Sequence, residues 1–305
     1  MEQDIRLVAV DLDGTLFRSD GTISLFTRRV IKEATRAGLS VLVATGRPRC
    51  MAERVAGWLG LDTPLICCNG ARVFSGKPPG SNERKLWGFV PMGEEEVLGV
   101  TSILREMDVY FHVHIEDTLA LEARNLRRVP KNHFSIRRFL WTSFGGYWMV
   151  RPKVLRDGTT EKYSGLIPKI CADGPEDVIA EVESRVLKRF PGRLQCVKTD
   201  RTFLEIMSVK VNKGEALAAV ATRMNFSMDQ VAAIGDGDND IEMVSRAGIG
   251  VAVANGSPKL CLEASDIALS NDDDGPARFI LDILRGRVSR EKRKRSDTRA
   301  AADCS

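Results

Sequence analysis

Apolar and polar residues follow two different rhythms along this chain. Near the N-terminal end, short apolar runs with the length of buried strands occupy residues 7–10, 41–44 and 64–68. Between the first two runs, residues 25–37 place their apolar side chains at helical spacing, with Ser24 as a candidate N-cap and Gly38 as the stop. This part of the chain therefore predicts strands that are joined by helices.

The same rhythm returns toward the C-terminal end. A helical pattern runs over residues 214–224, and the apolar run 231–234 indicates a further strand, followed at once by the polar stretch 235–240. Strands that alternate with helices in this way form a parallel sheet with right-handed crossovers. We therefore predict an α/β core to which both ends of the chain contribute.

The middle of the chain shows tighter spacing and more regular alternation. Strand-like runs occupy residues 109–115, 118–122, 163–172, 193–198 and 203–209. Helical patterns accompany them at residues 94–107 and 175–189. This combination is typical of an α+β module with an antiparallel sheet. We expect the module at residues 89–209, inserted into a core that consists of residues 1–88 and 210–288.

Two carboxylates stand at the tip of the first predicted strand. Asp11 and Asp13 flank Leu12 directly after the apolar run, and Gly14 then allows a sharp turn. Ligands of open α/β sheets bind beyond the carboxyl ends of the strands, and alternate residues of a strand share a side. Because close carboxylates repel each other unless a cation or a shared proton intervenes, this tip predicts a metal site, an acid-base pair, or both.

Further polar groups follow other predicted strands. Thr45 and the N–H of Gly46 stand at the tip of the second strand, Lys213 opens a helix, and Asp236 ends a late strand. The strand tips of one parallel sheet share an edge, so these distant positions can meet there. A cation, a lysine, a hydroxyl and two carboxylates form a cradle for a transferring phosphoryl group.

Charge is distributed unevenly, which changes the meaning of the net charge of +4. Residues 285–305 hold eight of the 45 Lys and Arg residues and three of the 41 acidic residues, so 37 and 38 remain in the rest of the 305-residue chain. The nearly neutral body has no electrostatic footprint for nucleic acid. We expect the tail 289–305 to be solvated and disordered, with polyanion contact as the alternative.

The basic segment 124–138 is expected to be a solvated face, with contact to acidic substrates as the alternative.

Cysteines and histidines add two expectations. The seven cysteines form no Cys-x-x-Cys pair and their number is odd, which favours reduced thiols in a cytoplasmic protein over a disulfide framework. The N-terminal residues leave no room for a signal peptide, and no apolar run approaches the roughly 20 residues that cross a bilayer. His112 and His114 lie on one side of a predicted strand, where we expect a sheet-surface pair without a third metal ligand, with metal binding as the alternative.

Taken in order, the strand-tip motifs resemble those of one known family. The chain is similar to haloacid dehalogenase-superfamily phosphatases of the Cof-like branch over most of residues 6–284. The resemblance rests on Asp11-Leu12-Asp13-Gly14-Thr15, Thr45-Gly46-Arg47, Asn69-Gly70-Ala71, Lys213-Gly214 and Gly235-Asp236-Gly237-Asp238-Asn239-Asp240. It implies a Rossmann-like parallel-sheet core with an inserted α+β cap.

The resemblance also implies a role for each matching residue. Asp11 is the nucleophile that forms an aspartyl-phosphate, and Asp13 is the general acid for the leaving alcohol and then the base that activates water. Lys213 steadies the nucleophile and the phosphate, while Thr45 and the N–H of Gly46 bind phosphate oxygens.

Magnesium is the implied cofactor, since Mg²⁺ prefers oxygen ligands and retains several waters. The implied ligands are the side chains of Asp11 and Asp236 and the backbone carbonyl of Asp13. Asn239 and Asp240 are the supporting metal or phosphate contacts.

Several positions keep an alternative role. Thr45 could instead cap the helix that follows it. Lys210 is a rival for the position of Lys213, which the following glycine favours. Arg47 either touches the phosphate or leaving group or pairs with an acidic neighbour, and Asn69 is expected to face the site from the end of the third strand.

The resulting hypothesis is a magnesium-dependent phosphoric monoester hydrolase that acts on small phosphorylated metabolites. Sugar phosphates are the default substrates by resemblance, and nucleotide or vitamin phosphates stay open. One alternative is a phosphoacceptor signalling module, which also uses clustered Asp, a Thr and a Lys but does not need the long insertion. A phosphomutase-like phosphotransferase is another alternative, whereas a transport ATPase is excluded by the missing membrane spans.

Overall fold

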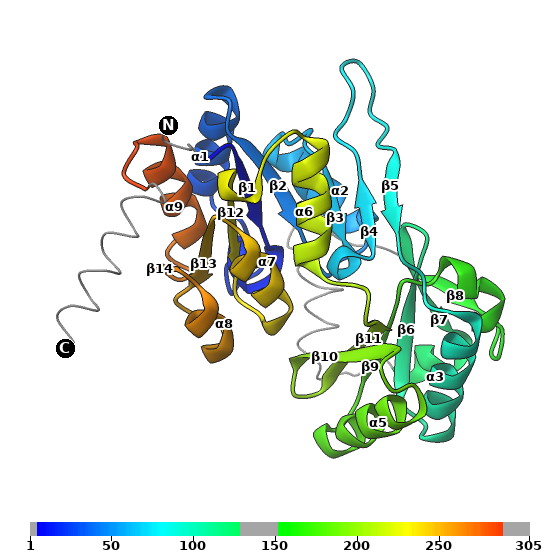
Figure 1. The fold of residues 1–305 in the computed structure, drawn as a ribbon. Coiled ribbons are helices and arrows are strands. Elements are labelled where there is room, and N and C mark those ends of the chain that lie inside the picture. The colour runs from blue at the N-terminus through cyan, green and yellow to red at the C-terminus, as the bar shows by residue number, and fades with distance from the viewer. Residues whose placement is uncertain (1–4, 129–151, 289–305) are drawn as a thin grey trace, which may run out of the picture.

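The structure is a computed structural model that describes residues 5–128 and 152–288 (Figure 1). The predicted tail 289–305 and much of the basic segment 124–138 lie outside these described residues. Figure 1 shows two bodies, each built on its own sheet, which we call the core and the cap.

An eight-stranded sheet in the order β14-β13-β12-β1-β2-β3-β4-β5 forms the core. Its parallel strands are β1 (Leu7–Val10), β2 (Ser40–Ala44), β3 (Leu65–Cys67), β12 (Val231–Gly235), β13 (Ile249–Val253) and β14 (Asp266–Ala268). The antiparallel strands β4 (Arg72–Phe74) and β5 (Leu86–Phe89) extend one edge. The sheet is therefore mixed, whereas the alternation of strands and helices predicted only parallel pairing.

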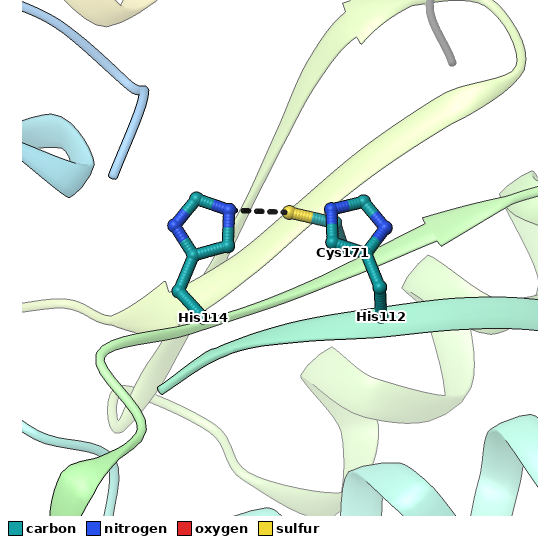
Figure 2. Close-up of side chains that lie close together, drawn as sticks. All are labelled: His112, His114 and Cys171. Atoms are coloured by element: carbon teal, nitrogen blue, oxygen red, sulfur yellow. Dashed lines mark hydrogen bonds between the residues drawn. The ribbon is translucent and has the colours of Figure 1, made fainter. Parts of the chain in front are cut away.

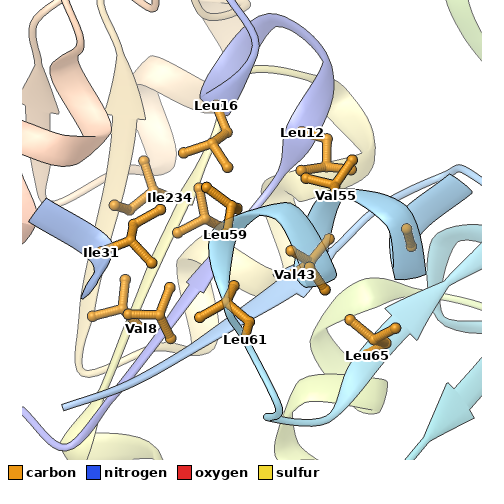
Figure 3. Close-up of a cluster of buried hydrophobic side chains, with 14 of the residues drawn as sticks. Val8, Leu12, Leu16, Ile31, Val43, Val55, Leu59, Leu61, Leu65 and Ile234 are labelled. Atoms are coloured by element: carbon orange, nitrogen blue, oxygen red, sulfur yellow. The ribbon is translucent and has the colours of Figure 1, made fainter. Parts of the chain in front are cut away.

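Helices cover both faces of the core sheet, so successive residues of β1 pack into hydrophobic clusters on opposite faces. Val8 and Val10 belong to the cluster that Figure 3 shows, and Leu7 and Ala9 belong to the opposite one. The first face carries α1 (Leu25–Arg36), α2 (Arg49–Leu59) and α9 (Gly275–Leu284). The second face carries α6 (Lys213–Arg223), α7 (Ile241–Arg246) and α8 (Pro258–Glu263). Burial on both sides explains why the core strands read as continuous apolar runs.

The predicted signals at the ends of α1 are confirmed. The hydroxyl of Ser24 accepts a hydrogen bond of 2.9 Å from the backbone N–H of Thr27, so Ser24 is the N-cap. The helix ends at Arg36, and Gly38 adopts a φ of 86°, a conformation that side chains with a Cβ rarely take.

The cap is a six-stranded sheet in the order β10-β11-β9-β6-β7-β8 with helices on one face. Its strands are β6 (Tyr110–Ile115), β7 (Thr118–Glu122), β8 (Lys153–Leu155), β9 (Lys169–Asp173), β10 (Leu194–Asp200) and β11 (Phe203–Ser208). All pairs are antiparallel except β7 with β8. The covering helices are α3 (Glu94–Glu106) and α5 (Glu176–Arg189). The predicted architecture of an α/β core with an α+β insertion is therefore confirmed.

The strand predicted at 163–172 is wrong in its first half. Residues 160–166 form a 3₁₀ helix, and β9 begins only at Lys169. Pro168 has no N–H to donate to a sheet ladder, and Gly165 has no side chain to pack on a pleated surface, so the ladder starts after the proline.

No helix within the described ranges is both long enough and apolar enough to span a bilayer.

Two helical glycines provide a test of the packing between α3 and α5. A Cβ added to the buried Gly99 in α3 would lie 2.4 Å from Cζ of Phe190, whereas one added to the exposed Gly57 in α2 would meet nothing within 4 Å. We expect Gly99→Ala to destabilise the cap by about 1–3 kcal/mol through overpacking. The matched Gly57→Ala variant should be neutral or stabilise by up to about 1 kcal/mol, because alanine is the better helix former.

Denaturant unfolding followed by circular dichroism measures both free energies. A gain in stability for Gly99→Ala equal to that for Gly57→Ala would contradict the close packing of α3 on Phe190.

Candidate active site

The carboxyl ends of three neighbouring strands bring the predicted residues together. In the register of β12, β1 and β2, Val10 lies between Ile234 and Val43. The residues that follow these strand ends are Asp11, Asp236 and Thr45, so polar groups that are more than 190 residues apart in the chain reach one edge of the sheet.

Lys213 is the centre of a buried cluster of charged side chains at this edge of the sheet. It is the first residue of α6, its side chain has no exposed surface, and its Nζ donates to Oδ1 of Asp11 at 2.6 Å and to Oδ1 of Asp240 at 2.7 Å. Burial by itself lowers the pKa of Lys213, but the two carboxylates outweigh it and leave the pKa above its ordinary value. The rival Lys210 is exposed and lies outside this cluster.

Three carboxylates surround this one lysine. Oxygens of Asp11, Asp236 and Asp240 lie within 4.8 Å of one another. Burial raises the pKa of Asp11, and Asp240 and Asp236 add to this against the opposing charge of Lys213. Burial and the charge of Asp240 raise the pKa of Asp236 to about 7. Three acidic groups against one cation leave a negative excess that a bound divalent cation would compensate.

The residues of this cluster fit Mg²⁺ in their chemistry, because all the side-chain donors are carboxylate oxygens. Asp236 also accepts a 2.7 Å hydrogen bond from the hydroxyl of Thr15. Both carboxylate oxygens of Asp240 already accept hydrogen bonds. Oδ1 accepts from Lys213, and Oδ2 accepts from the backbone N–H groups of Asp236 and Gly237 at 3.1 Å each. Asp240 thus orients Lys213 and the loop that carries Asp236.

The glycine of the first motif is required by this packing. Gly14 has a φ of 77°, and a Cβ at this position would lie 2.2 Å from Oδ2 of Asp236. Its carbonyl oxygen accepts a hydrogen bond of 2.8 Å from Asn255. Gly14 therefore allows the loop after β1 to approach the loop after β12.

Asp13 and Arg47 form a two-pronged ion pair. Nε and Nη2 of Arg47 donate to the two oxygens of Asp13 at 2.6 and 2.5 Å, and the guanidinium lies 4.9 Å from the ring centre of Phe17. The side chain of Arg47 is 8% exposed and that of Asp13 is 52% exposed. Of the two roles that the sequence left open for Arg47, the structure shows pairing with an acidic neighbour.

The loops after β2 and β3 are joined by backbone hydrogen bonds of 3.0 Å from the N–H of Asn69 to the carbonyl of Thr45 and from the N–H of Cys68 to that of Arg47. The buried hydroxyl of Thr45 accepts from the backbone N–H of Arg47 at 3.1 Å, and the N-cap position of α2 is taken by Pro48, so Thr45 does not cap that helix. Oδ1 of Asn69 accepts from Asn239 at 3.2 Å.

A cavity of about 590 Å³ opens between core and cap at this edge. From the predicted set, the residues that line it are Asp11, Asp13, Gly46, Arg47, Asp236 and Asn239. Thr45, Asn69, Lys213 and Asp240 lie behind this wall and support it through the hydrogen bonds above. The cap contributes a second wall formed by His112, His114, Lys169, Cys171, Phe203 and Glu205, among others.

Two charged cap residues in that wall were not predicted from the sequence. Lys169 is buried, and its Nζ donates to Oε1 of Glu205 at 2.6 Å and to the carbonyl of Gly46 at 2.8 Å. Oε2 of Glu205 accepts from Nδ2 of Asn69 at 2.5 Å. This ion pair joins the cap to two loops of the core. The signal in the sequence was a single charged residue within an apolar stretch, at 166–172 for Lys169 and at 203–207 for Glu205.

The comparison with family models gives one assignment. Residues 8–280 match the model of the haloacid dehalogenase-like hydrolases. Among curated proteins, a phosphoglycolate phosphatase of Methanopyrus kandleri is 29% identical over 281 residues, which cover 91% of this chain and 97% of the relative. The 5-amino-6-(5-phospho-D-ribitylamino)uracil phosphatase YcsE of Bacillus subtilis is 27% identical over 281 residues, with 91% and 95% covered.

Solved structures share the fold over nearly the whole chain. A haloacid dehalogenase-like hydrolase of Bacteroides thetaiotaomicron aligns with a TM-score of 0.77 at 22% identity and covers 92% of this chain and 100% of its own. A HAD/COF-like hydrolase of Plasmodium vivax aligns with a TM-score of 0.78 at 21% identity, with 93% and 96% covered. The match of the family model over most of the chain confirms the predicted resemblance: this chain belongs to the haloacid dehalogenase-like hydrolases, and the two curated relatives described above are phosphatases.

Proposed function

We propose that this chain is a magnesium-dependent phosphatase that hydrolyses small phosphorylated metabolites through an aspartyl-phosphate on Asp11. The observation that carries the proposal is the buried contact of Lys213 with Asp11 beside the cavity that Asp13 also lines. Lys213 holds one oxygen of the Asp11 carboxylate, which leaves the other for attack on phosphorus. A reduced, cytoplasmic setting agrees with the free cysteines, which the described part of the chain holds at six positions.

In the first step, Asp11 forms a bond to phosphorus while the bond from phosphorus to the leaving oxygen breaks. The leaving oxygen takes a proton from Asp13 and departs as an alcohol. In the second step, Asp13 takes a proton from water, whose oxygen attacks phosphorus and releases Asp11 and inorganic phosphate. Lys213 keeps Asp11 oriented in both steps.

Asp13 must leave Arg47 to act as an acid, because the guanidinium favours the charged carboxylate. A phosphoryl group in the cavity competes for Arg47, which lines the same cavity. The half-exposed side chain of Asp13 can then turn toward the leaving oxygen. In this proposal Arg47 serves in turn as the partner of Asp13 and as a phosphate contact.

Asp11, Asp236 and the backbone carbonyl of Asp13 would hold Mg²⁺, which supplies charge neutralisation for the phosphoryl oxygens. The backbone of Gly46 binds phosphate oxygens, and the buried Thr45 supports this loop through its hydrogen bond from the N–H of Arg47. Asn69 and Asn239 join the loops after β3 and β12. The cap wall with His112, His114 and Phe203 faces the leaving group and sets its identity.

The cavity volume and the names of the relatives support substrates of metabolite size. Phosphoglycolate and a phosphorylated ribitylaminouracil are the substrates named for two relatives, and a sugar phosphate or a similar compound is proposed for this chain. A phosphomutase-like phosphotransferase would pass the phosphoryl group to a second hydroxyl instead of water, and a signalling module would keep it.

Phosphate release tests the proposal directly. We expect the purified chain to release inorganic phosphate from a panel of small phosphoesters with Mg²⁺ present, and chelation to lower the rate by at least about 100-fold. Restored Mg²⁺ should restore the rate. A phosphorylated chain without free phosphate would favour the signalling module, and transfer to a sugar hydroxyl would favour the phosphotransferase.

Asp11→Asn should lower turnover by at least about 1,000-fold, since an amide is a poor nucleophile. The matched control is Asp62→Asn, which changes an exposed carboxylate in the loop before β3 and should keep the wild-type rate. Phosphate release and circular dichroism measure activity and folding of both variants. If Asp11→Asn retained more than about a tenth of the activity, Asp11 would not be the nucleophile.

Asp13→Asn should separate the two steps. An aryl leaving group needs little protonation, so Asp13→Asn should slow the phosphorylation of Asp11 by an aryl phosphate only slightly. Phosphorylation by an alkyl phosphate should slow far more, because a general acid contributes about 10²–10⁴-fold to that rate. The phosphoenzyme should then accumulate, because its hydrolysis lacks the base. Single-turnover quench experiments with both substrate types measure this, and equal losses would remove Asp13 from the role of acid.

A further inference from the structure

The face of the cap sheet that lines the cavity carries a row of chemically active side chains. Period-two alternation turns Phe111 and Ile170 toward α3 and α5, whereas His112 and Cys171 turn the other way. In the register of the three central strands, His112 pairs with Cys171 and Cys171 pairs with Glu205. The sequence predicted a pair without a third metal ligand, whereas the structure places a third candidate ligand, Cys171 of the adjacent strand, beside the two histidines.

His112, His114 and Cys171 converge closely enough to share one ion (Figure 2). One ligand atom from each lies within 4.8 Å of those from the other two. Nε2 of His114 lies 3.9 Å from Sγ of Cys171, and the two imidazoles are stacked with centroids 5.9 Å apart. A nitrogen and a sulfur bound tetrahedrally to one Zn²⁺ lie about 3.5 Å apart, from bond lengths near 2.1 and 2.3 Å. Small side-chain shifts would complete this geometry.

A second residue orients the His114 ring. Its Nδ1 lies 3.3 Å from Sγ of Cys68, a core residue directly after β3. In the tautomer that carries its proton on Nδ1, this nitrogen donates to Cys68 and Nε2 presents its lone pair toward Cys171. Metal-binding histidines in proteins are held through their other nitrogen in the same way.

The surroundings of the cluster keep both imidazoles in the neutral form that binds metals. Burial and Lys169 lower the pKa of His112 to about 3 and also lower that of His114, so both imidazoles are neutral and able to ligate. The positive charge of Lys169 is balanced by Glu205 at 2.6 Å. Burial raises the pKa of Cys171, so the metal must displace the thiol proton, which leaves to solvent as the metal–sulfur bond forms.

We propose that His112, His114 and Cys171 form a binding site for a borderline transition-metal cation of the Zn²⁺ class in the cap wall of the catalytic cavity. Two imidazoles and a thiolate select such a cation and reject Mg²⁺, which the carboxylates on the core side prefer. Since all three residues line the cavity, the fourth coordination position opens toward it. Water or a donor atom of a cavity ligand occupies that position.

Cobalt absorption tests this site independently of phosphatase activity. The full chain, freed of transition metals and held in saturating Mg²⁺, is titrated with Co²⁺ under reducing conditions. We expect one equivalent to bind with a thiolate-to-cobalt charge-transfer band and tetrahedral d–d bands, and Zn²⁺ to displace it. Absence of the thiolate band in the wild-type chain would overturn the proposal without any variant.

Variants then identify the ligands. Cys171→Ser should abolish the thiolate band and weaken metal binding by at least about 100-fold, and His112→Gln should weaken it to a similar degree. Cys196→Ser is the matched control, since it changes a half-buried cysteine of the cap edge strand β10 and should keep the wild-type spectrum. Asp11→Asn should also keep the band, which separates this site from the proposed Mg²⁺ site.

Circular dichroism verifies that each variant is folded. A thiolate band that persists in folded Cys171→Ser, or disappears in Cys196→Ser or in Asp11→Asn, would overturn the assignment to these three residues. If Cys171→Ser does not fold, His112→Gln decides the question. Binding of Co²⁺ by this variant with the same affinity as the wild-type chain would exclude the site.

Discussion

The buried ammonium group of Lys213 is the interaction on which the catalytic edge depends. Its side chain has no exposed surface, so its charge needs partners inside the protein. Asp11 lies 202 residues away in the chain and Asp240 lies 27 residues away, yet both bind Nζ within 2.7 Å. Removal of either carboxylate would leave a buried charge less compensated. The ends of β1 and β12 and the start of α6 are thereby held at one point.

The same requirement applies where cap and core meet. Lys169 is buried at the cavity wall and is satisfied by Glu205 in the cap and by the carbonyl of Gly46 in the core. Glu205 in turn accepts from Asn69. The contact uses charged groups that need partners, so its geometry is specific and the loops after β2 and β3 are fixed by cap residues.

Local sequence patterns were sufficient for most elements and for the carboxylates that the structure places at one edge of the core sheet. Apolar runs such as 7–10 and 231–234 predicted the buried strands, and Ser24 and Gly38 predicted the ends of α1. Asp11, Asp13 and Asp236 were identified because carboxylates directly after buried strands have no packing role. The short antiparallel strands β4 and β5 and the late start of β9 were not predicted, since brief runs near prolines and glycines carry little periodic signal.

The sequence by itself determined which side chains reach the catalytic edge, because strand ends in a parallel sheet share an edge whatever their order. Only the tertiary structure decided which of these groups touch. The pairing of Arg47 with Asp13, the bridge from Lys169 to Gly46, and the approach of Cys171 to His112 and His114 depend on strand order, on register and on the position of the cap. These are long-range properties, and a one-residue change of register would turn every side chain of a strand to the opposite face.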